Sequence, residues 1–135
     1  MIVVDTNVLV YAVRPGQQTE AALRAKRHDP DWLAPAFWRL EMRNVLALSM
    51  RVDGLSMETA LEAFAAAEEL VEDVELESVV EDSLDLCRQA SISAYDAEFV
   101  LTAQRLGVPL VTADRRLAER AGERVVRLDE FVPEP

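Results

Sequence analysis

The segment Ile2-Val3-Val4-Asp5-Thr6-Asn7 predicts a buried strand that leads directly into a helix. Its first three residues are apolar without alternation, as expected for a parallel strand that is covered on both faces. An aspartate follows at once, and threonine and asparagine are residue types that cap helices. A second apolar run, Leu110-Val111-Thr112, is followed one residue later by Asp114. The two runs predict two buried parallel strands, each ending near a carboxylate.

Further strands and helices are predicted outward from these runs. The five predicted strands are Ile2–Val4, Asp31–Ala34, Val74–Glu77, Leu110–Thr112 and Val125–Leu128. The helical patterns cover Asn7–Ala12, Thr19–Arg27, Pro35–Met50, Ser56–Val71, Ser78–Gln89, Ser93–Leu106 and Arg115–Ala121. Strands that alternate with helices indicate βαβ units and a parallel sheet. We therefore expect a single α/β domain over residues 1–135.

Four acids are candidate metal ligands. Open parallel sheets bind ligands beyond the carboxyl ends of their strands, so Asp5 and Asp114 share one crevice if their strands are neighbours. Glu41 falls, with Asn44, on an apolar helical stripe, where a carboxylate is costly unless it is paired or bound to a metal. The stripe consists of Phe37, Leu40, Val45 and Leu48. Asp96 lies on the predicted inner face of its helix, one turn before Phe99 and Val100.

Simpler roles for these residues stay open. Asp96 could be an acid that favours the first turn of a helix, and Glu41 could pair with Arg39 or Arg43. Thr6 and Asn7 could cap the short helix that follows them, and this role is compatible with support of a metal site. Cys87, the only cysteine, is interpreted as a small apolar residue of a helix.

The charge is unevenly distributed. The formal net charge is -11, which argues against a nucleic-acid partner. Twelve acids and no Lys or Arg lie between Arg51 and Arg88, so the rest of the chain carries 13 acids and all 14 basic residues. The acidic stretch predicts a solvated helical face, with a docking surface for a basic partner as the alternative. The remaining surface is neutral to basic.

The inventory of side chains narrows the chemistry. Clustered carboxylates raise one another's pKa, and hard cations such as Mg²⁺ or Mn²⁺, which prefer oxygen ligands, remove that penalty. His28 is the only histidine, so neither a pair of imidazoles nor a Ser-His-Asp triad is a plausible mechanism. Metal-activated water attacking a phosphodiester is the chemistry that remains. Thr112 could face the same crevice, and Arg115 and Arg116 could contact substrate phosphate.

The chain is expected to be cytoplasmic. A single cysteine permits no disulfide within the chain, and such proteins are by default cytosolic. No apolar run reaches the roughly 20 residues that a membrane-spanning helix needs. The apolar start of the chain has no basic region before it and ends at Asp5, so we expect no signal peptide and no membrane partner.

Four segments resemble the motifs of PIN-domain nucleases, in order and over nearly the whole chain. They are Val3-Val4-Asp5-Thr6-Asn7-Val8-Leu9, the segment Trp38 to Leu46 around Glu41, Ser93-Ala94-Tyr95-Asp96-Ala97-Glu98-Phe99, and the segment Leu110 to Leu117 around Asp114. The length is similar to that of VapC-type toxins of bacterial toxin–antitoxin pairs. The resemblance implies a three-layer α/β/α fold with a five-stranded parallel sheet.

The resemblance also implies an activity and partners. It implies Mg²⁺ or Mn²⁺ held by Asp5, Glu41, Asp96 and Asp114, with Thr6, Asn7, Thr112 and Glu98 in support. The implied reaction is endonucleolytic cleavage of RNA, often a structured RNA such as tRNA, that leaves a 5′-phosphate. The implied partners are a second copy of the chain and a VapB-type antitoxin that covers a hydrophobic groove.

Three other functions are weighed against this one. A phosphotransferase with Asp5 as nucleophile would need a lysine near the phosphate, but the only lysine is Lys26, and Glu41 would have no role. A non-catalytic binding module could use Trp32, Trp38 and Phe37 as a partner surface if they were exposed. A DNA-directed nuclease could use the same metal site, because RNA preference rests on the resemblance alone.

Overall fold

A computed structural model of the chain describes residues 1–75 and 77–132. The described residues form five parallel strands in the order β3-β2-β1-β4-β5. The strands are β1 (Ile2–Val4), β2 (Trp32–Pro35), β3 (Val71–Val74), β4 (Leu110–Thr112) and β5 (Val125–Arg127). The predicted α/β class with a five-stranded parallel sheet is confirmed.

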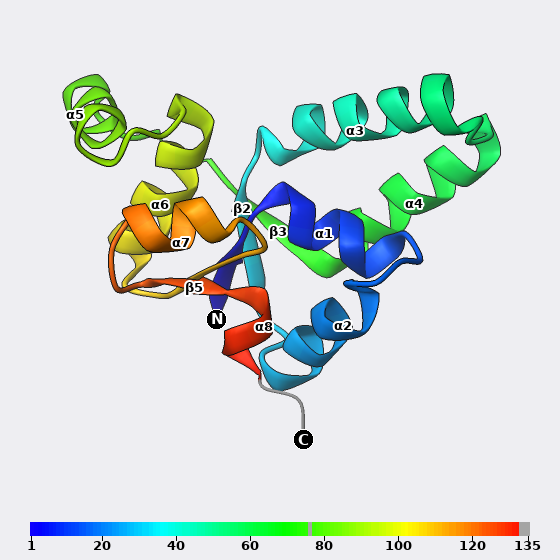
Figure 1. Ribbon diagram of the computed structural model, residues 1–135, viewed down its shortest axis with the longest axis horizontal. Coiled ribbons are helices and arrows are strands. Elements are labelled where there is room, and N and C mark those ends of the chain that lie inside the picture. The colour runs from blue at the N-terminus through cyan, green and yellow to red at the C-terminus, as the bar shows by residue number, and fades with distance from the viewer. Residues whose placement is uncertain (76, 133–135) are drawn as a thin grey trace.

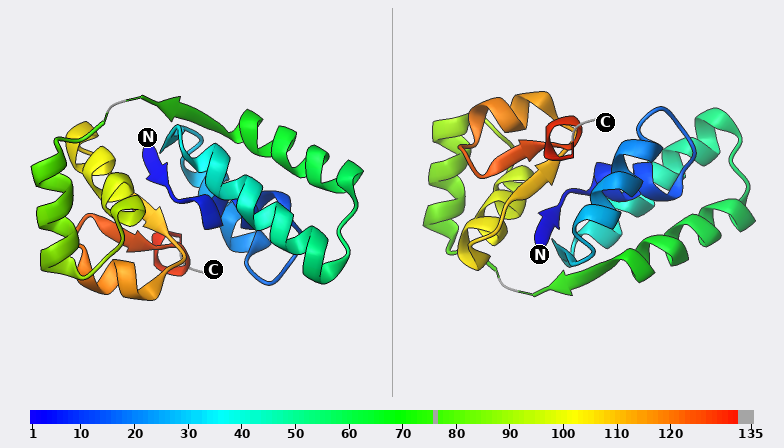
Figure 2. Two further views of the ribbon diagram at one scale, coloured as in Figure 1. Left: turned by 90° about the horizontal axis from the view of Figure 1, so that it is seen from above. Right: turned by 90° about the horizontal axis from the view of Figure 1, so that it is seen from below.

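Helices cover both faces of the sheet (Figures 1 and 2). One group consists of α1 (Thr6–Val13), α2 (Thr19–His28), α3 (Trp38–Asp53) and α4 (Met57–Leu70). The other consists of α5 (Val80–Ala90), α6 (Ala94–Leu106) and α7 (Arg115–Arg120), and the short α8 (Leu128–Phe131) packs near α2 and β5. None of the helices in the described part of the chain combines the length and apolar character needed to cross a membrane.

The central strands form as predicted because their side chains are apolar on both faces. Ile2, Val3 and Val4 of β1 are at most 1 % exposed, and β4 is buried along its whole length. Val3 pairs with Leu110 and Val4 with Val111, so the next residues, Asp5 and Thr112, lie side by side. This register places both strand ends at one edge of the sheet.

The third strand and the third helix are the two elements that lie furthest from their predicted bounds. The third strand is Val71–Val74 rather than Val74–Glu77, and Leu76 of the predicted range lies outside the described residues. The sequence pattern does not reveal this edge strand because its central residues are acidic. One of them, Asp73, is held in the strand by hydrogen bonds from the Trp38 indole and the Arg39 guanidinium. Pro35 was predicted in the first turn of the third helix but ends β2, and α3 begins at Trp38.

The apolar face of α3 was also predicted wrongly. The core face is formed by Trp38, Met42 and Leu46, which are at most 6 % exposed. Leu40 and Leu48 of the predicted stripe are 66 % and 50 % exposed, because a different face of the helix packs against the core. Trp32 and Trp38 are core residues, which removes them as a partner surface.

Lys26 ties three elements together at the opposite, amino end of the strands. Its ammonium donates hydrogen bonds of 2.6 Å to the carbonyl oxygens of Pro30 and Leu70 and lies 5.0 Å from the Trp32 ring. Burial lowers the pKa of this lysine, and the neighbouring acids oppose that effect. The single lysine of the chain is therefore a structural residue that links the end of α2 to β2 and to the end of α4.

Gly54 ends α3 in the left-handed backbone region with φ of 70°, and its N–H donates to the Ser49 carbonyl. Gly54→Ala should lower the free energy of unfolding by about 1 kcal/mol, because a Cβ is unfavourable at this φ. No atom lies within 4 Å of the position of the added Cβ, so the loss would be due to the backbone alone. Urea denaturation measures it.

Gly16→Ala is the matched control. Its added Cβ also meets nothing within 4 Å, but Gly16 lies outside the left-handed region. This change should leave stability unchanged or raise it by about 0.5 kcal/mol. Equal losses in both variants would contradict the explanation.

Candidate metal centre

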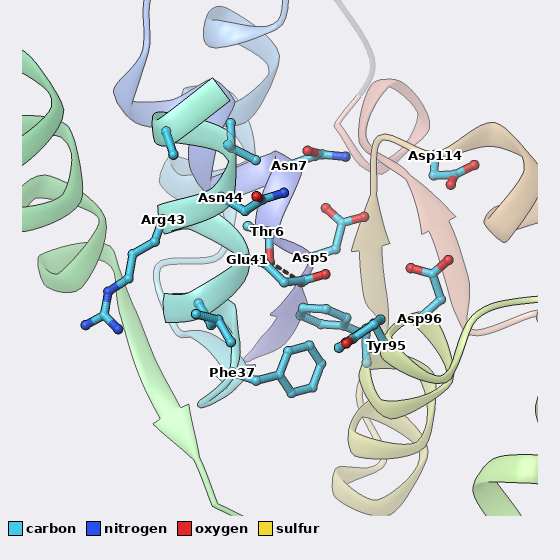
Figure 3. A pocket seen from close by; sticks show the side chains of 14 residues that line it. Asp5, Thr6, Asn7, Phe37, Glu41, Arg43, Asn44, Tyr95, Asp96 and Asp114 are labelled. Atoms are coloured by element: carbon cyan, nitrogen blue, oxygen red, sulfur yellow. Dashed lines mark hydrogen bonds between the residues drawn. The ribbon is translucent and has the colours of Figure 1, made fainter. Parts of the chain in front are cut away.

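The four predicted acids surround one pocket at the carboxyl edge of the sheet (Figure 3). The pocket has a volume of about 660 Å³, within the range of ligand-binding cavities. Asp5 follows β1, Glu41 lies in the first turn of α3, Asp96 in the first turn of α6, and Asp114 precedes α7. Residues that are far apart in the sequence thus share one hollow because parallel strands end at the same edge.

Asp5 is the most buried of the four, with 7 % of its surface exposed. One carboxylate oxygen accepts from the Val8 N–H at 3.1 Å, which caps α1, and the other accepts from the Thr112 hydroxyl. Burial raises the pKa of Asp5 to about 6, because the hydrogen bonds from Thr112 and Val8 only partly offset the loss of solvation. The negative charges of Asp96 and Asp114 raise it further.

The Thr112 hydroxyl connects the Asp5 carboxylate to the backbone of Asp114. The Thr112 side chain is fully buried, donates to Asp5 and accepts the Asp114 N–H at 3.0 Å. The Asp114 carboxylate in turn accepts the N–H groups of Arg116 and Leu117, at 2.9 and 3.2 Å, and so caps α7. One hydroxyl therefore fixes the relative positions of two of the acids.

Glu41 and Asp96 are half-buried on facing walls of the pocket. Glu41 accepts a 2.7 Å hydrogen bond from the Thr6 hydroxyl, and its pKa is raised by burial and, to a smaller degree, by the charge of Asp96. Burial raises the pKa of Asp96, and the charge of Asp114 adds to that effect. Arg39 pairs with Glu68 and Asp73, so it is not the ion-pair partner of Glu41.

The other predicted residues are divided between the pocket and its surroundings. Thr6 and Asn7 line the pocket, with Asp5 rather than either of them capping α1. Glu98 does not join the acids: it accepts from the Ser78 hydroxyl in a neighbouring hollow under α5. Arg115 and Arg116 are exposed in the first turn of α7 and are not among the residues that line the pocket.

Three polar residues that line the pocket were not predicted as site residues, namely Arg43, Asn44 and Tyr95. Tyr95 immediately precedes Asp96 and lies off the buried face of α6, and this position next to an acid was a signal that could have identified it. Arg43 lines the pocket, but its guanidinium lies 5.6 Å from the Phe64 ring and points away from the carboxylates (Figure 3). No sequence pattern reveals that orientation.

The donor set fits a hard divalent cation, because all four charged groups are carboxylates with oxygen ligands. Burial and the negative charge of neighbouring carboxylates raise the pKa of Asp5, Glu41 and Asp96, and a bound cation would relieve both effects. Within residues 1–75 and 77–132, however, no three acidic, histidine or cysteine side chains already converge tightly enough to hold one ion. The carboxylates are grouped around the pocket but are not preassembled.

The PIN domain profile matches residues 2–123, so the chain belongs to the PIN domain family. PIN domains are generally nucleases and often depend on a metal. The crystal structure of PAE2754 from Pyrobaculum aerophilum is similar, with a TM-score of 0.76 over 95 % of this chain and 83 % of that chain. The two sequences are 18 % identical, so this likeness concerns the fold alone. No curated protein matches the chain.

Asp5→Asn should make the protein more stable at neutral pH. A carboxyl group with a raised pKa keeps its proton to a higher pH in the folded state than in the unfolded state. The free energy of unfolding of the wild type should therefore fall as pH rises from about 3.8 to about 6 and stay lower above that. The neutral asparagine avoids this loss. The variant should therefore gain about 1–3 kcal/mol at pH 8 and little at pH 3.5, as measured by urea denaturation.

Asp53→Asn is the control for this comparison, because it removes the same charge from the exposed end of α3. Its stability should follow the pH dependence of the wild type. A gain in Asp5→Asn of equal size at pH 3.5 and pH 8 would show that the ionised carboxylate is not the source.

Proposed function

We propose that this chain is a metal-dependent endoribonuclease that acts as the toxin of a VapBC-type toxin–antitoxin pair. One observation carries the proposal: Asp5, Glu41, Asp96 and Asp114 come from distant segments and line a single pocket. Three of them have raised pKa values, which is a feature of sites that hold a cation or perform proton chemistry.

The cofactor that the donor chemistry favours is Mg²⁺, with Mn²⁺ able to substitute. Such a cation, when bound, neutralises phosphate charge and activates water for hydrolysis of a phosphodiester. Asp5, Glu41, Asp96 and Asp114 would hold it. Whether one or two ions bind depends on how far the carboxylates move, and metal titration counts them.

Hydrogen bonds from neighbouring residues orient two of the carboxylates that would hold the metal. The Thr112 hydroxyl holds one oxygen of Asp5, and the Val8 N–H holds the other, so this carboxylate has a fixed direction. The Thr6 hydroxyl does the same for Glu41. Hydrogen bonds of this kind typically change metal affinity or activity by about 10- to 100-fold when they are removed.

The partners proposed for this function are an RNA substrate, a second copy of the chain and an antitoxin. Leu40 and Leu48 support the protein partners, because both side chains of α3 are at least half exposed, and Leu40 lines the pocket. Exposed aliphatic side chains in a groove are typical of protein contacts. A VapB-type antitoxin lying along α3 would cover these leucines and reach the acids.

The purified protein should cut RNA in Mg²⁺ or Mn²⁺ and not in EDTA. Asp5→Asn should reduce the rate at least about 100-fold, because it removes a ligand charge from the metal site. Total RNA and tRNA are the substrates, gel electrophoresis gives the rate, and sequencing of the fragment ends gives the target. Single-stranded and duplex DNA of matched sequence test the DNA-directed alternative.

Asp53→Asn serves as the control here too, and should cut at the wild-type rate. Cleavage that persists in EDTA, or that is equal in Asp5→Asn and wild type, would overturn the catalytic proposal. Metal binding without cleavage of any of these nucleic acids would favour the non-catalytic binding module.

The toxin role has a separate test in cells. Induced expression of the wild-type chain in bacteria should slow growth, since cleavage of cellular RNA stops protein synthesis, and Asp5→Asn at equal protein level should not. Growth curves together with immunoblots measure both. Equal slowing by the two proteins would mean that any toxicity does not come from the proposed site.

A further inference from the structure

Tyr95 is an exposed aromatic ring at the edge of the carboxylate pocket. It lies in the first turn of α6, next in sequence to Asp96, and is 61 % exposed although it lines the pocket. Phe99, one turn further along the same helix, is 1 % exposed. Tyr95 therefore contributes little to the core, and its location needs another explanation.

The Tyr95 ring packs against Phe37, which in turn packs against the buried Phe99. Phe37 meets Tyr95 edge to face, with ring centroids 5.8 Å apart and an interplanar angle of 62°. Phe37 meets Phe99 in the same way, at 5.2 Å and 72°. Figure 3 shows Phe37 and Tyr95 together at the side of the pocket that borders Glu41 and Asp96. This chain of contacts holds the Tyr95 ring in place while most of its surface stays accessible.

The charge of the pocket limits how it can bind a nucleic acid. Four carboxylates line it, and among its described lining residues Arg43 is the one cation, with its guanidinium directed at Phe64 instead. Phosphate contacts supply most of the affinity of ordinary nucleic-acid-binding proteins through Lys and Arg. That source is weak here, so contacts to the bases must carry more of the binding.

We propose that Tyr95 is a stacking surface for an unpaired nucleobase of the substrate, next to the phosphate that meets the carboxylate site. The inference rests on the proposed function. It adds a residue that contacts the substrate, and the base that it contacts must be unpaired, because the faces of bases within a duplex are already stacked and out of reach. Stacking on an aromatic ring tolerates any base and operates in RNA and DNA alike.

The first measurement is binding without cleavage. An oligoribonucleotide carrying an unpaired 2-aminopurine, whose fluorescence falls on stacking, is titrated with full-length protein in Ca²⁺ and in EDTA, with gels to check that it stays intact. Wild type and Tyr95→Phe should quench the fluorescence equally. Tyr95→Leu should lose the quenching and bind about tenfold more weakly, the effect expected for loss of one stacked base.

Two controls isolate the ring. Leu61→Ala removes a side chain of α4 with similar exposure, 63 %, outside the pocket, and should bind like wild type. The same fluorophore placed inside a hairpin stem should show little quenching. A deoxyribose version that is quenched equally would support the base alone as the ligand, and weaker quenching would support the base with an added contact to ribose.

The salt dependence gives an independent readout. Raising NaCl from about 50 to 200 mM should weaken binding less than about tenfold, because Arg43 is the one basic side chain among the described residues that line the pocket. The loss in Tyr95→Leu should have the same size at both salt concentrations. Thermal melting of each variant verifies that the exposed substitution leaves the fold unchanged.

Several results would overturn the proposal. They are wild-type binding by Tyr95→Leu, equal losses in Tyr95→Phe and Tyr95→Leu, and no binding by wild type in either buffer. Conversion of a dimer to monomers by Tyr95→Leu, with nucleic-acid binding unchanged, would assign the ring to a protein contact instead. Failure of the catalytic proposal is distinguishable, because it appears as equal cleavage by wild type and Asp5→Asn and leaves the binding data unaffected.

Discussion

The burial of Asp5 at the carboxyl end of the central strand is the constraint on which the rest of the site depends. A carboxylate that is 7 % exposed loses most of its solvation and is stable only with hydrogen bonds or a cation beside it. Pairing of β1 with β4 places Thr112 beside Asp5, where its hydroxyl donates to the carboxylate. The same hydroxyl accepts the Asp114 N–H and so fixes the position of Asp114. The sheet register, the capping of α1 and α7, and the grouping of the acids are therefore parts of one arrangement.

The sequence predicted best where local and long-range preferences agree. The apolar runs of β1 and β4 gave correct strands because their side chains are buried, as apolar types suggest. Ser56, the first residue of the fourth predicted helix, caps α4 by accepting a hydrogen bond from the Thr59 N–H. The prediction failed for β3, where acidic residues form an edge strand. It also failed for the face of α3, because the exposed leucines and the buried Trp38 and Met42 make two competing apolar stripes. Packing against α1 and α4 decides which stripe is buried.

In the candidate site, too, some residues were predicted correctly and others were not. All four acids of the motifs line the pocket, because strand ends and helix starts fix where their Cα atoms lie. Glu98 does not reach it, since residues two positions apart on a helix face different directions, and it contacts Ser78 instead. The direction of a long side chain such as Arg43 depends on a neighbour from another helix, the Phe64 ring, and no local pattern specifies that contact.

The position of Lys26 determines how the protein reacts with reagents that modify lysine side chains. Lys26 is the only lysine in the chain, and its ammonium is bonded to two backbone carbonyls and packed over the Trp32 ring. Acylation of this amine would require those bonds to break and the ends of α2 and α4 to loosen. Amine-directed cross-linkers and labels therefore find no freely available lysine side chain on this protein, and its basic surface is a surface of arginines.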